Sequence, residues 1–274
     1  MKEIPIRAVI TGSSSGIGRE IAIQLAQQSS GDDQSHLVIH YRRNRSGAEQ
    51  TARLVQAIGC RVDVVQADLC DPDQRSRLVD FAWDFLGVPT TWVNNAGADV
   101  LTGDARKLSF TEKLDRLIAT DVLATIDLSR QVIERMMDGI GPDASHANDS
   151  QPNLFPPSMT FIGWDQAPFG MEGDAGQMFG PVKAAVMAFA NSLAQEVAPA
   201  IRVNTVAPGW IKTAWGESTD SYWDNRAKAE SLMDRWGSPA DVARAVCFVA
   251  DPANTFCSGQ TIHVNGGWNR TRRS

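Results

Sequence analysis

Short apolar, β-branched runs alternate along the chain with longer segments of helical periodicity. The short runs predict seven strands: Ala8 to Ile10, Leu37 to Ile39, Val62 to Val65, Thr91 to Val93, Met159 to Ile162, Val203 to Val206 and Thr261 to Val264. The longer segments predict helices, including Gly16 to Gln28, Gly47 to Ile58, Gln74 to Phe85, Glu112 to Met137, Pro181 to Val197 and Ala240 to Ala250. This alternation indicates βαβ units, and so a doubly wound α/β fold with a mostly parallel seven-stranded sheet and helices on both faces.

Two stretches lack either pattern. The segment Asp138 to Ser158 is rich in Gly, Pro, Asp, Asn and Ser, which predicts a surface loop between a long helix and the fifth strand. The segment Thr213 to Arg235 follows the sixth strand and is irregular. The aromatic residues in or directly after it are Trp215, Tyr222, Trp223 and Trp236. Long loops are often functional, so these aromatics indicate either a satellite of the core or a lid over a pocket.

Composition sets limits on domain number and partners. The chain has 274 residues, of which 43% are hydrophobic, and no linker or internal repeat divides it, so we predict a single domain over residues 1–274. The net charge of -6 argues against nucleic acid as a partner, because such a surface would release no counterions from a phosphate backbone. No apolar run approaches the roughly 20 residues that a membrane helix needs, so a membrane is not an expected partner either.

The four cysteines suggest neither a metal site nor a disulfide framework. Cys60, Cys70, Cys247 and Cys257 form no Cys-x-x-Cys pair, and no group of histidines lies beside them. A reducing cytoplasm is therefore the expected location. The segment Met1 to Ile10 also lacks the charged, apolar and small-residue zones of a signal peptide.

A glycine-rich turn separates the first predicted strand from the first predicted helix. Its sequence is Thr11-Gly12-Ser13-Ser14-Ser15-Gly16-Ile17-Gly18. Glycines at such a turn let the backbone approach a pyrophosphate closely, and the free N–H groups at the helix N-terminus stabilise its charge. The position of the turn therefore predicts a dinucleotide-binding site of the Rossmann type.

Further motifs follow in an order that resembles the short-chain dehydrogenase/reductase family, most closely its 3-oxoacyl-[acyl-carrier-protein] reductases. They are Asp68-Leu69 after the third strand, Asn94-Asn95-Ala96-Gly97 after the fourth, Pro208-Gly209 after the sixth and Val264-Asn265-Gly266-Gly267 after the seventh. The resemblance covers nearly the whole chain. It implies a nicotinamide cofactor site formed by Gly12, Ser13, Ser14, Ser15, Gly16, Ile17, Gly18, Arg42, Arg43, Asp68, Leu69, Asn95, Ala96, Gly97, Lys183, Pro208, Gly209, Ile211 and Thr213.

The end of the second strand favours NADP(H) over NAD(H). It reads His40-Tyr41-Arg42-Arg43, where an NAD-preferring enzyme would carry an acidic side chain on the adenosine ribose. A guanidinium there would instead clamp the 2′-phosphate. The alternative is that Arg42 and Arg43 are solvated loop charges without a ligand.

The catalytic positions of the family are altered. In the family a Tyr-x-x-x-Lys pair begins the helix after strand five, and the tyrosine gives a proton to the carbonyl oxygen as hydride reaches the carbon. In this chain Phe179 stands where the family has tyrosine, while Lys183 matches the lysine and is expected to hold the nicotinamide ribose. Trp164 stands where the family's serine would steady the carbonyl, and Asp121 aligns with its helix asparagine. Loss of a positioned acid typically costs about 10²- to 10⁴-fold in rate.

Three residues are candidates for a replacement proton donor: Asp121, Asp165 and Tyr222. Burial can keep a carboxyl protonated near neutral pH, and the loop with Tyr222 would fold over the substrate pocket in this family. Each also has an ordinary structural interpretation. Two functions are therefore predicted as alternatives. One is an NADP(H)-dependent oxidoreductase with an atypical proton donor that acts on 3-oxoacyl thioesters or other carbonyls. The other is a catalytically silent NADP(H)-binding sensor or scaffold. The resemblance also implies a small-molecule substrate and a homodimer or homotetramer.

Overall fold

Seven parallel strands form one sheet in the computed structural model, which describes residues 5–29, 35–140 and 155–268. The strands are β1 Arg7–Ile10, β2 His36–Tyr41, β3 Arg61–Gln66, β4 Thr91–Asn94, β5 Ser158–Ile162, β6 Arg202–Pro208 and β7 Thr261–Val264. Their order is β3-β2-β1-β4-β5-β6-β7, and every neighbouring pair is parallel. The chain reverses direction across the sheet between β1 and β4, and in such sheets the ligand crevice lies at that point, outside the carboxyl ends of the strands.

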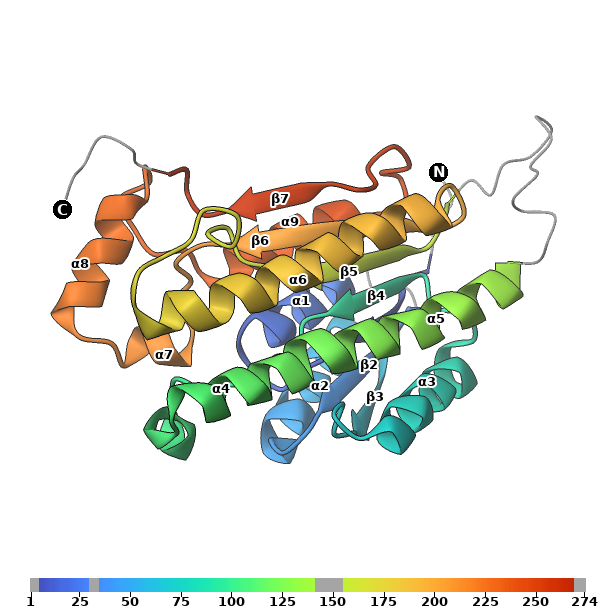
Figure 1. The fold of residues 1–274 in the computed structure, drawn as a ribbon. Coiled ribbons are helices and arrows are strands. Elements are labelled where there is room, and N and C mark those ends of the chain that lie inside the picture. The colour runs from blue at the N-terminus through green and yellow to red at the C-terminus, as the bar shows by residue number, and fades with distance from the viewer. Residues whose placement is uncertain (1–4, 30–34, 141–154, 269–274) are drawn as a thin grey trace.

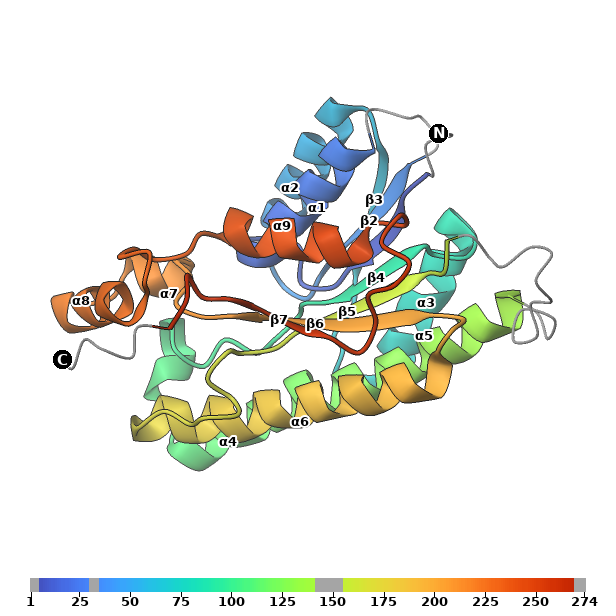
Figure 2. The ribbon, with the colours of Figure 1, turned by 90° about the horizontal axis from the view of Figure 1, so that it is seen from above.

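Helices cover both faces of the sheet (Figures 1 and 2). The helices are α1 Gly16–Gln28, α2 Arg45–Ile58, α3 Pro72–Leu86, α4 Phe110–Leu117, α5 Thr125–Ile140, α6 Gly173–Val197, α7 Ala214–Glu217, α8 Ser221–Glu230 and α9 Pro239–Ala250. A 3₁₀ turn, η1, spans Gly103–Lys107, and a π-helical segment, η2, spans Ile118–Ala124. Helices α1, α2 and α9 lie on one face, and α3, α4, α5 and α6 lie on the other. The predicted doubly wound α/β fold is confirmed. No helix among the described residues is long and apolar enough to cross a membrane.

Alternation along the central strands divides the core into two halves. Val9 of β1 and Val38 of β2 point to the face covered by α3, α5 and α6, whereas Ile10 and Leu37 point to the face covered by α1, α2 and α9. Each of these four side chains is fully buried. Successive strand residues face opposite sides of a sheet, so a strand covered on both faces is apolar at every position.

The structure corrects the prediction of one regular helix from Glu112 to Met137. Helix α4 ends at Leu117, the π-helical η2 follows, and α5 then continues to Ile140. A π-helical turn accommodates extra residues per turn and frequently occurs at functional sites. Here it contains Asp121, whose side chain is 3% exposed.

Helix α6 begins eight residues before the predicted start at Pro181. A proline inside a helix removes one backbone hydrogen bond, which is why the sequence suggested a boundary there. In the structure Pro181 is exposed and stays within the helix. The added first turns bury Met178, which packs with Leu117 and Val182 in a small apolar cluster, and this packing offsets the lost bond.

The two irregular segments also differ from expectation. The predicted loop Asp138 to Ser158 falls mostly outside the described residues, but its first residues belong to α5 and Ser158 begins β5. The segment Thr213 to Arg235 contains two short helices, α7 and α8. Its tryptophans Trp215 and Trp223 pack against each other, and both also line a pocket.

Leu78, fully buried on α3, tests the core beneath this face of the sheet. We expect Leu78→Ala to lower the free energy of unfolding by about 2 to 5 kcal/mol, because it removes apolar contact and leaves a cavity. Leu54→Ala on α2, where the side chain is 42% exposed, is the matched control and should change it by less than about 0.5 kcal/mol. Urea denaturation measures both; equal effects would contradict this assignment of the core.

Candidate active site

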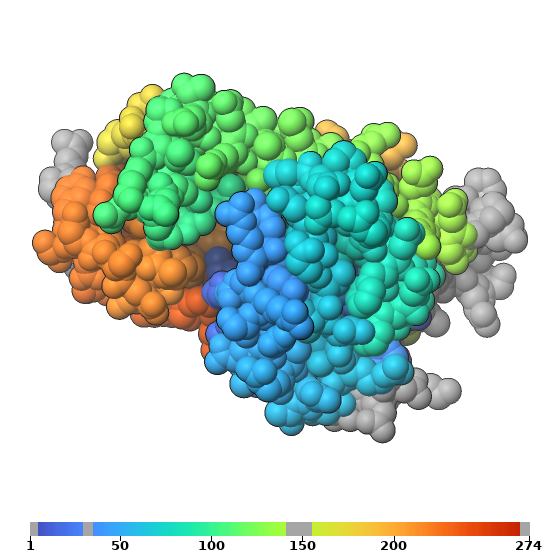
Figure 3. All heavy atoms as spheres, turned by 90° about the horizontal axis from the view of Figure 1, so that it is seen from below, coloured from blue at the N-terminus to red at the C-terminus, as the bar shows by residue number. Residues whose placement is uncertain are grey.

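A pocket of about 420 Å³ lies at the carboxyl ends of the central strands. Figure 3 shows a hollow in this region, where the blue segment around α1 and α2 meets the orange segment around α7 and α8. Several predicted cofactor residues line the pocket: Ile17, Lys183, Pro208, Gly209, Ile211 and Thr213. Five tryptophans also line it: Trp164, Trp210, Trp215, Trp223 and Trp236. The pocket therefore joins the predicted nicotinamide end of the cofactor site to a mainly aromatic space.

The glycine-rich turn after β1 brings backbone segments into close contact. Gly12 has a φ of +65°, and a Cβ atom there would come within 2.8 Å of the Cα atom of Ala96. A Cβ atom on Gly18 would collide with the carbonyl oxygen of Gly12 and the side-chain amide of Asn95. These positions require glycine, and the backbone around them is exposed to approach by a ligand.

Polar contacts hold the ends of β1 and β4 together at this turn. The Thr11 hydroxyl accepts hydrogen bonds from the backbone N–H groups of Asn95 and Ala96, both at 3.0 Å. The Asn95 side chain donates to the carbonyl oxygens of Thr11 and Gly12 at 2.9 and 3.1 Å. The predicted residues Asn95, Ala96 and Gly97 are thereby brought beside the glycine-rich turn.

His40 is also part of this group of contacts, and no pattern in the sequence predicted a role for it. Its ring Nδ1 accepts a hydrogen bond from the Gly12 N–H at 3.0 Å, and its Nε2 lies 3.0 Å from the carbonyl oxygen of Ala67. Burial lowers the pKa of His40 to about 4, so the ring is neutral near pH 7 with its proton on Nε2. A buried imidazole with one donor and one acceptor thus joins the turn after β1 to the end of β3.

The remaining predicted adenosine-side residues follow β2 and β3. Arg42 and Arg43 are exposed, and neither guanidinium has a hydrogen-bond or ion-pair partner within the described part of the chain. The Asp68 carboxylate accepts the Cys70 N–H at 3.0 Å, whereas Leu69 is buried in the core. The Gly12 cradle and the free N-terminus of α1 together fit the pyrophosphate of a dinucleotide.

Lys183 and Asp121 form a buried ion pair at the wall of the pocket. The Lys183 ammonium lies 3.0 Å from an Asp121 carboxylate oxygen and 3.3 Å from the carbonyl oxygen of Ile162. The other Asp121 oxygen accepts the Ala98 N–H at 2.8 Å. Gly97 allows this approach, since a Cβ atom there would come within 2.9 Å of the carboxylate. Asp121 therefore connects η2, the turn after β4 and α6, and each of its two carboxylate oxygens has a partner.

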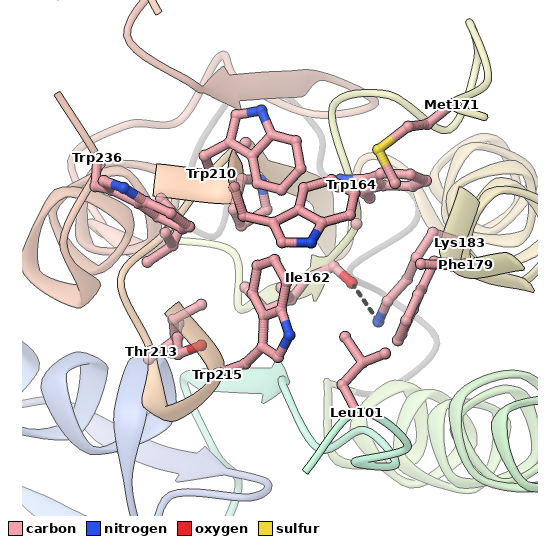
Figure 4. A pocket seen from close by; sticks show the side chains of 17 residues that line it. Leu101, Ile162, Trp164, Met171, Phe179, Lys183, Trp210, Thr213, Trp215 and Trp236 are labelled. Carbon is pink, nitrogen blue, oxygen red and sulfur yellow. Dashed lines mark hydrogen bonds between the residues drawn. The ribbon is translucent and has the colours of Figure 1, made fainter. Parts of the chain in front are cut away.

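Phe179 and Trp164 occupy the catalytic side of the pocket. Figure 4 shows Phe179 beside Lys183 on one side of the space, with Thr213 and Trp236 on the opposite side. The Phe179 ring also packs against the apolar cluster that includes Leu117. Among the described residues that line the pocket, Lys183 is the single charged one. No carboxyl or phenol thus faces the site from this lining.

Tyr222, a predicted alternative proton donor, does not line the pocket. Its side chain is 60% exposed on α8, where its ring contacts Trp223 edge-on at 5.1 Å. Its hydroxyl oxygen lies 3.5 Å from a nitrogen of Arg226. The expectation that this loop would bring Tyr222 over the substrate does not agree with the structure, because Trp223 and not Tyr222 is directed to the pocket.

Asp165 also faces away from the pocket. It lines a separate cavity of about 520 Å³ with Phe169, His263, Asn265 and Trp268. One carboxylate oxygen accepts a hydrogen bond from Asn265 at 3.0 Å, and the other is buried without a partner among the described residues. Burial raises the pKa of Asp165 to about 6. The predicted perturbation of this carboxyl is present, but it does not face Phe179.

Metal chemistry has no obvious site in this region. Across residues 5–29, 35–140 and 155–268, no group of three His, Cys, Asp or Glu side chains could hold a metal ion.

Comparison with known proteins gives matches along almost the whole chain. A family profile described as "short chain dehydrogenase" matches residues 7–143, and one described as "Enoyl-(Acyl carrier protein) reductase" matches residues 158–269. The 3-oxoacyl-[acyl-carrier-protein] reductase FabG of Staphylococcus aureus is 27% identical over 263 residues, covering 95% of this chain and 96% of its own. The 3beta-hydroxysteroid dehydrogenase 1 of Eggerthella lenta is 29% identical, covering 94% and 92%.

Solved structures confirm the fold. A short chain dehydrogenase from Burkholderia cenocepacia, solved in complex with NADP, superposes with a TM-score of 0.79 at 24% identity, covering 97% of this chain and 99% of its own. The keto-reducing enzyme LugOII of lugdunomycin biosynthesis superposes with a TM-score of 0.78, also at 24% identity, and covers 97% and 99%.

The raised pKa of Asp165 predicts a pH dependence of stability. The folded protein holds this proton more tightly than the unfolded chain, so stability falls as pH rises from about 3.8 to about 6. Asp165→Asn cannot titrate, so it removes this pH-dependent loss of stability, and the new amide can still form a hydrogen bond with Asn265. Between pH 4 and pH 7 the free energy of unfolding of the variant should rise by roughly 2 to 2.5 kcal/mol relative to that of the parent, measured by urea denaturation. A pH-independent difference would show that Asp165 does not titrate in this range.

Proposed function

Because this chain belongs to the short-chain dehydrogenase/reductase family, we propose that it is an NADP(H)-dependent reductase whose substrate accepts hydride without a proton from residue 179. One observation carries the proposal: Phe179 lines the pocket beside a lysine that is already ion-paired with Asp121. The cradle for the cofactor is intact, whereas the position of the proton donor holds a ring without an ionisable hydrogen. The protein would thus bind the cofactor without a side chain at position 179 that can transfer a proton.

The chain's own residues determine how NADPH would be held. The backbone around Gly12 and Gly18 would hold the pyrophosphate, Arg42 and Arg43 would hold the 2′-phosphate, and Lys183 would hold the nicotinamide ribose. When bound, the cofactor supplies a hydride to the substrate. The contact between Lys183 and the carbonyl oxygen of Ile162 fixes the height of the ammonium above the end of β5.

The pocket wall excludes water and does not donate a proton. Phe179, Trp164 and Leu101 provide apolar contact around the reacting part of the substrate. The Lys183 ammonium is directed to the Asp121 carboxylate and the Ile162 carbonyl oxygen, and it has no phenol beside it to relay a proton. Substrates that suit this wall are activated carbonyls, iminium ions and conjugated double bonds. A 3-oxoacyl thioester is included by resemblance to the FabG relative.

A silent NADP(H)-binding sensor or scaffold is the second candidate. The observation that favours it is the paired change at two catalytic positions, with Trp164 and Phe179 both lining the pocket. Loss of an acid and of a carbonyl-orienting donor would each reduce ketone reduction by roughly 10²-fold or more. The two candidates differ in one property, which is whether the unmodified protein oxidises NADPH with any substrate.

We also propose a homodimer or homotetramer. Exposed apolar side chains on the helical segment from α4 to α5 support it: Ile118, Leu123 and Met137 are 38%, 61% and 37% exposed. Such side chains commonly become buried at subunit interfaces. Analytical ultracentrifugation should report the mass of a dimer or a tetramer, and the mass of a monomer would contradict the proposal.

The preference for NADPH depends on the two arginines after β2. We expect Arg42→Ala combined with Arg43→Ala to raise the Kd for NADPH about tenfold to hundredfold, because charge-assisted bonds to a phosphate contribute about 1.5 to 3 kcal/mol. The Kd for NADH should change less than about threefold. Arg53→Ala, an exposed arginine within α2, is the matched control. Calorimetry measures all affinities, and equal losses for both cofactors would exclude a 2′-phosphate role.

Phe179→Tyr tests the proposed separation of binding from proton transfer. We expect the variant to reduce simple ketones roughly 10²-fold faster than the parent, since it gains a positioned phenol beside Lys183. Phe169→Tyr is the control, because Phe169 is 69% exposed outside this pocket. The assay follows NADPH oxidation with β-ketoacyl thioesters, diketones, quinones and an iminium ion.

The parent protein decides between the two functions in the same assay. Turnover of at least one activated substrate by the parent supports the reductase. If the parent is inactive with every substrate and only Phe179→Tyr turns over, the silent module is the correct interpretation.

A further inference from the structure

We infer that the pocket selects a planar cation, and that the substrate reduced there is an iminium ion. This inference deepens the proposed function and rests on it. It begins from the lining of the pocket, to which five tryptophans contribute from the segments after β5 and β6, from α7 and α8, and before α9. Indole faces carry the most negative electrostatic potential of the common aromatic side chains, and they attract cations within about 6 Å of the ring centre.

Four of these tryptophans form a packed wall. The Trp210 ring centroid lies 6.2 Å from that of Trp215, 5.7 Å from Trp223 and 6.0 Å from Trp236. The first pair is stacked, the second tilted and the third edge-to-face, and such aromatic pairs hold one another in fixed orientations. Figure 4 shows Trp210, Trp215 and Trp236 around one side of the space and Phe179 across from them. The wall is therefore preorganised for a flat ligand.

Hydrogen bonds outside the pocket make these rings more electron-rich. The Trp210 indole N–H donates to the Glu230 carboxylate at 2.7 Å, and the Trp236 indole N–H donates to the Asp224 carboxylate at 2.9 Å. A hydrogen bond to an anion polarises its donor and shifts electron density toward the ring face. Neither carboxylate lines the pocket. Each is also paired with a cation, Glu230 with Arg226 and Asp224 with Lys228, so these contacts act on the indoles through the hydrogen bonds and add no net charge.

The structure already contains a cation bound by this cluster. The guanidinium carbon of Arg226 lies 5.8 Å from the ring centroid of Trp210 and 5.4 Å from that of Trp223. Arg226 is itself neutralised by Glu172 and Glu230. The cluster thus accommodates positive charge on one side, and the pairing of Arg226 leaves little repulsion for a second cation inside the pocket.

The charge of the pocket agrees with a cationic ligand. Lys183 is the single charged residue among its described lining, and its ammonium is paired with Asp121 at 3.0 Å. An anionic substrate would find no free cation there. A positively charged substrate meets aromatic faces and a neutral ion pair, which favours it over an acid.

An iminium ion also removes the need for the missing proton donor. When its carbon accepts a hydride from the reduced nicotinamide, one C–H bond forms and the π electrons of the C=N bond become the nitrogen lone pair. The substrate is reduced to a neutral amine, NADPH is oxidised to NADP⁺, and no proton is consumed. A ketone reduced in the same way would leave an alkoxide that Phe179 cannot protonate.

A binding measurement tests the preference for a cation independently of catalytic turnover. The probes are N,N-dimethyltetrahydroisoquinolinium, a bicyclic quaternary ammonium cation that cannot accept hydride, and dimethyltetralone, a neutral ketone of similar bicyclic shape. Calorimetry on the protein–NADPH complex should give a Kd about tenfold lower for the cation, as expected for a desolvated cation–π contact. Equal affinities, or tighter binding of the ketone, would overturn the inference.

Variants at Trp164 test whether aromatic faces cause the preference. Trp164→Leu keeps apolar contact but removes the indole, and it should lower the ratio of cation to ketone affinity severalfold. Trp164→Phe should retain most of the ratio. Trp268→Leu is the matched control, because that tryptophan lines the separate cavity with Asp165. An unchanged Kd for NADPH shows that each variant is folded, and an unchanged ratio in Trp164→Leu would contradict the assignment.

Turnover then distinguishes the two levels of the proposal. NADPH oxidation with N-methyldihydroisoquinolinium, and none with tetralone, supports both the reductase and its substrate class. Turnover of tetralone without turnover of the iminium ion keeps the reductase and overturns this inference. If neither compound is turned over but the cation binds more tightly, the pocket is selective for cations and the proposed reductase function is wrong.

Discussion

The buried pair of Lys183 and Asp121 constrains the geometry of the whole site. Two charges removed from water are costly unless their geometry and remaining hydrogen bonds are good. Here the carboxylate accepts both the ammonium and the Ala98 N–H, and the ammonium also donates to the Ile162 carbonyl oxygen. These contacts require Asp121 to project from a widened helical turn and require α6 to lie close to the ends of β4 and β5.

The same pair determines which chemistry the neighbouring side chains can support. Because it fixes Lys183, it also fixes Phe179, which lies one helical turn earlier on α6 and lines the same pocket. The ammonium stays available to a ribose while its charge is balanced from within the protein. Under the proposed function, the site combines cofactor binding with an apolar reacting space, and the substrate itself is activated toward hydride.

Much of the fold and cofactor cradle could be predicted because local signals determine them. Apolar runs in β1 and β2, such as Ala8 to Ile10 and Leu37 to Ile39, predict strands covered on both faces. The spacing of glycines from Gly12 to Gly18 predicts the turn, and the structure adds the steric reason for two of them, contact with Ala96 and Asn95. The π turn at Asp121 and the early start of α6 could not be predicted. Both depend on tertiary contacts, which outweigh helix propensity and the usual effect of Pro181.

The site was harder to predict because side-chain direction depends on where a loop folds. Tyr222 and Trp223 are adjacent, yet the indole faces the pocket and the phenol faces solvent. Asp165 lies next to Trp164, but the alternation after β5 directs the two to different cavities. His40 showed no signal, since its role comes from one accepted and one donated hydrogen bond across two loops.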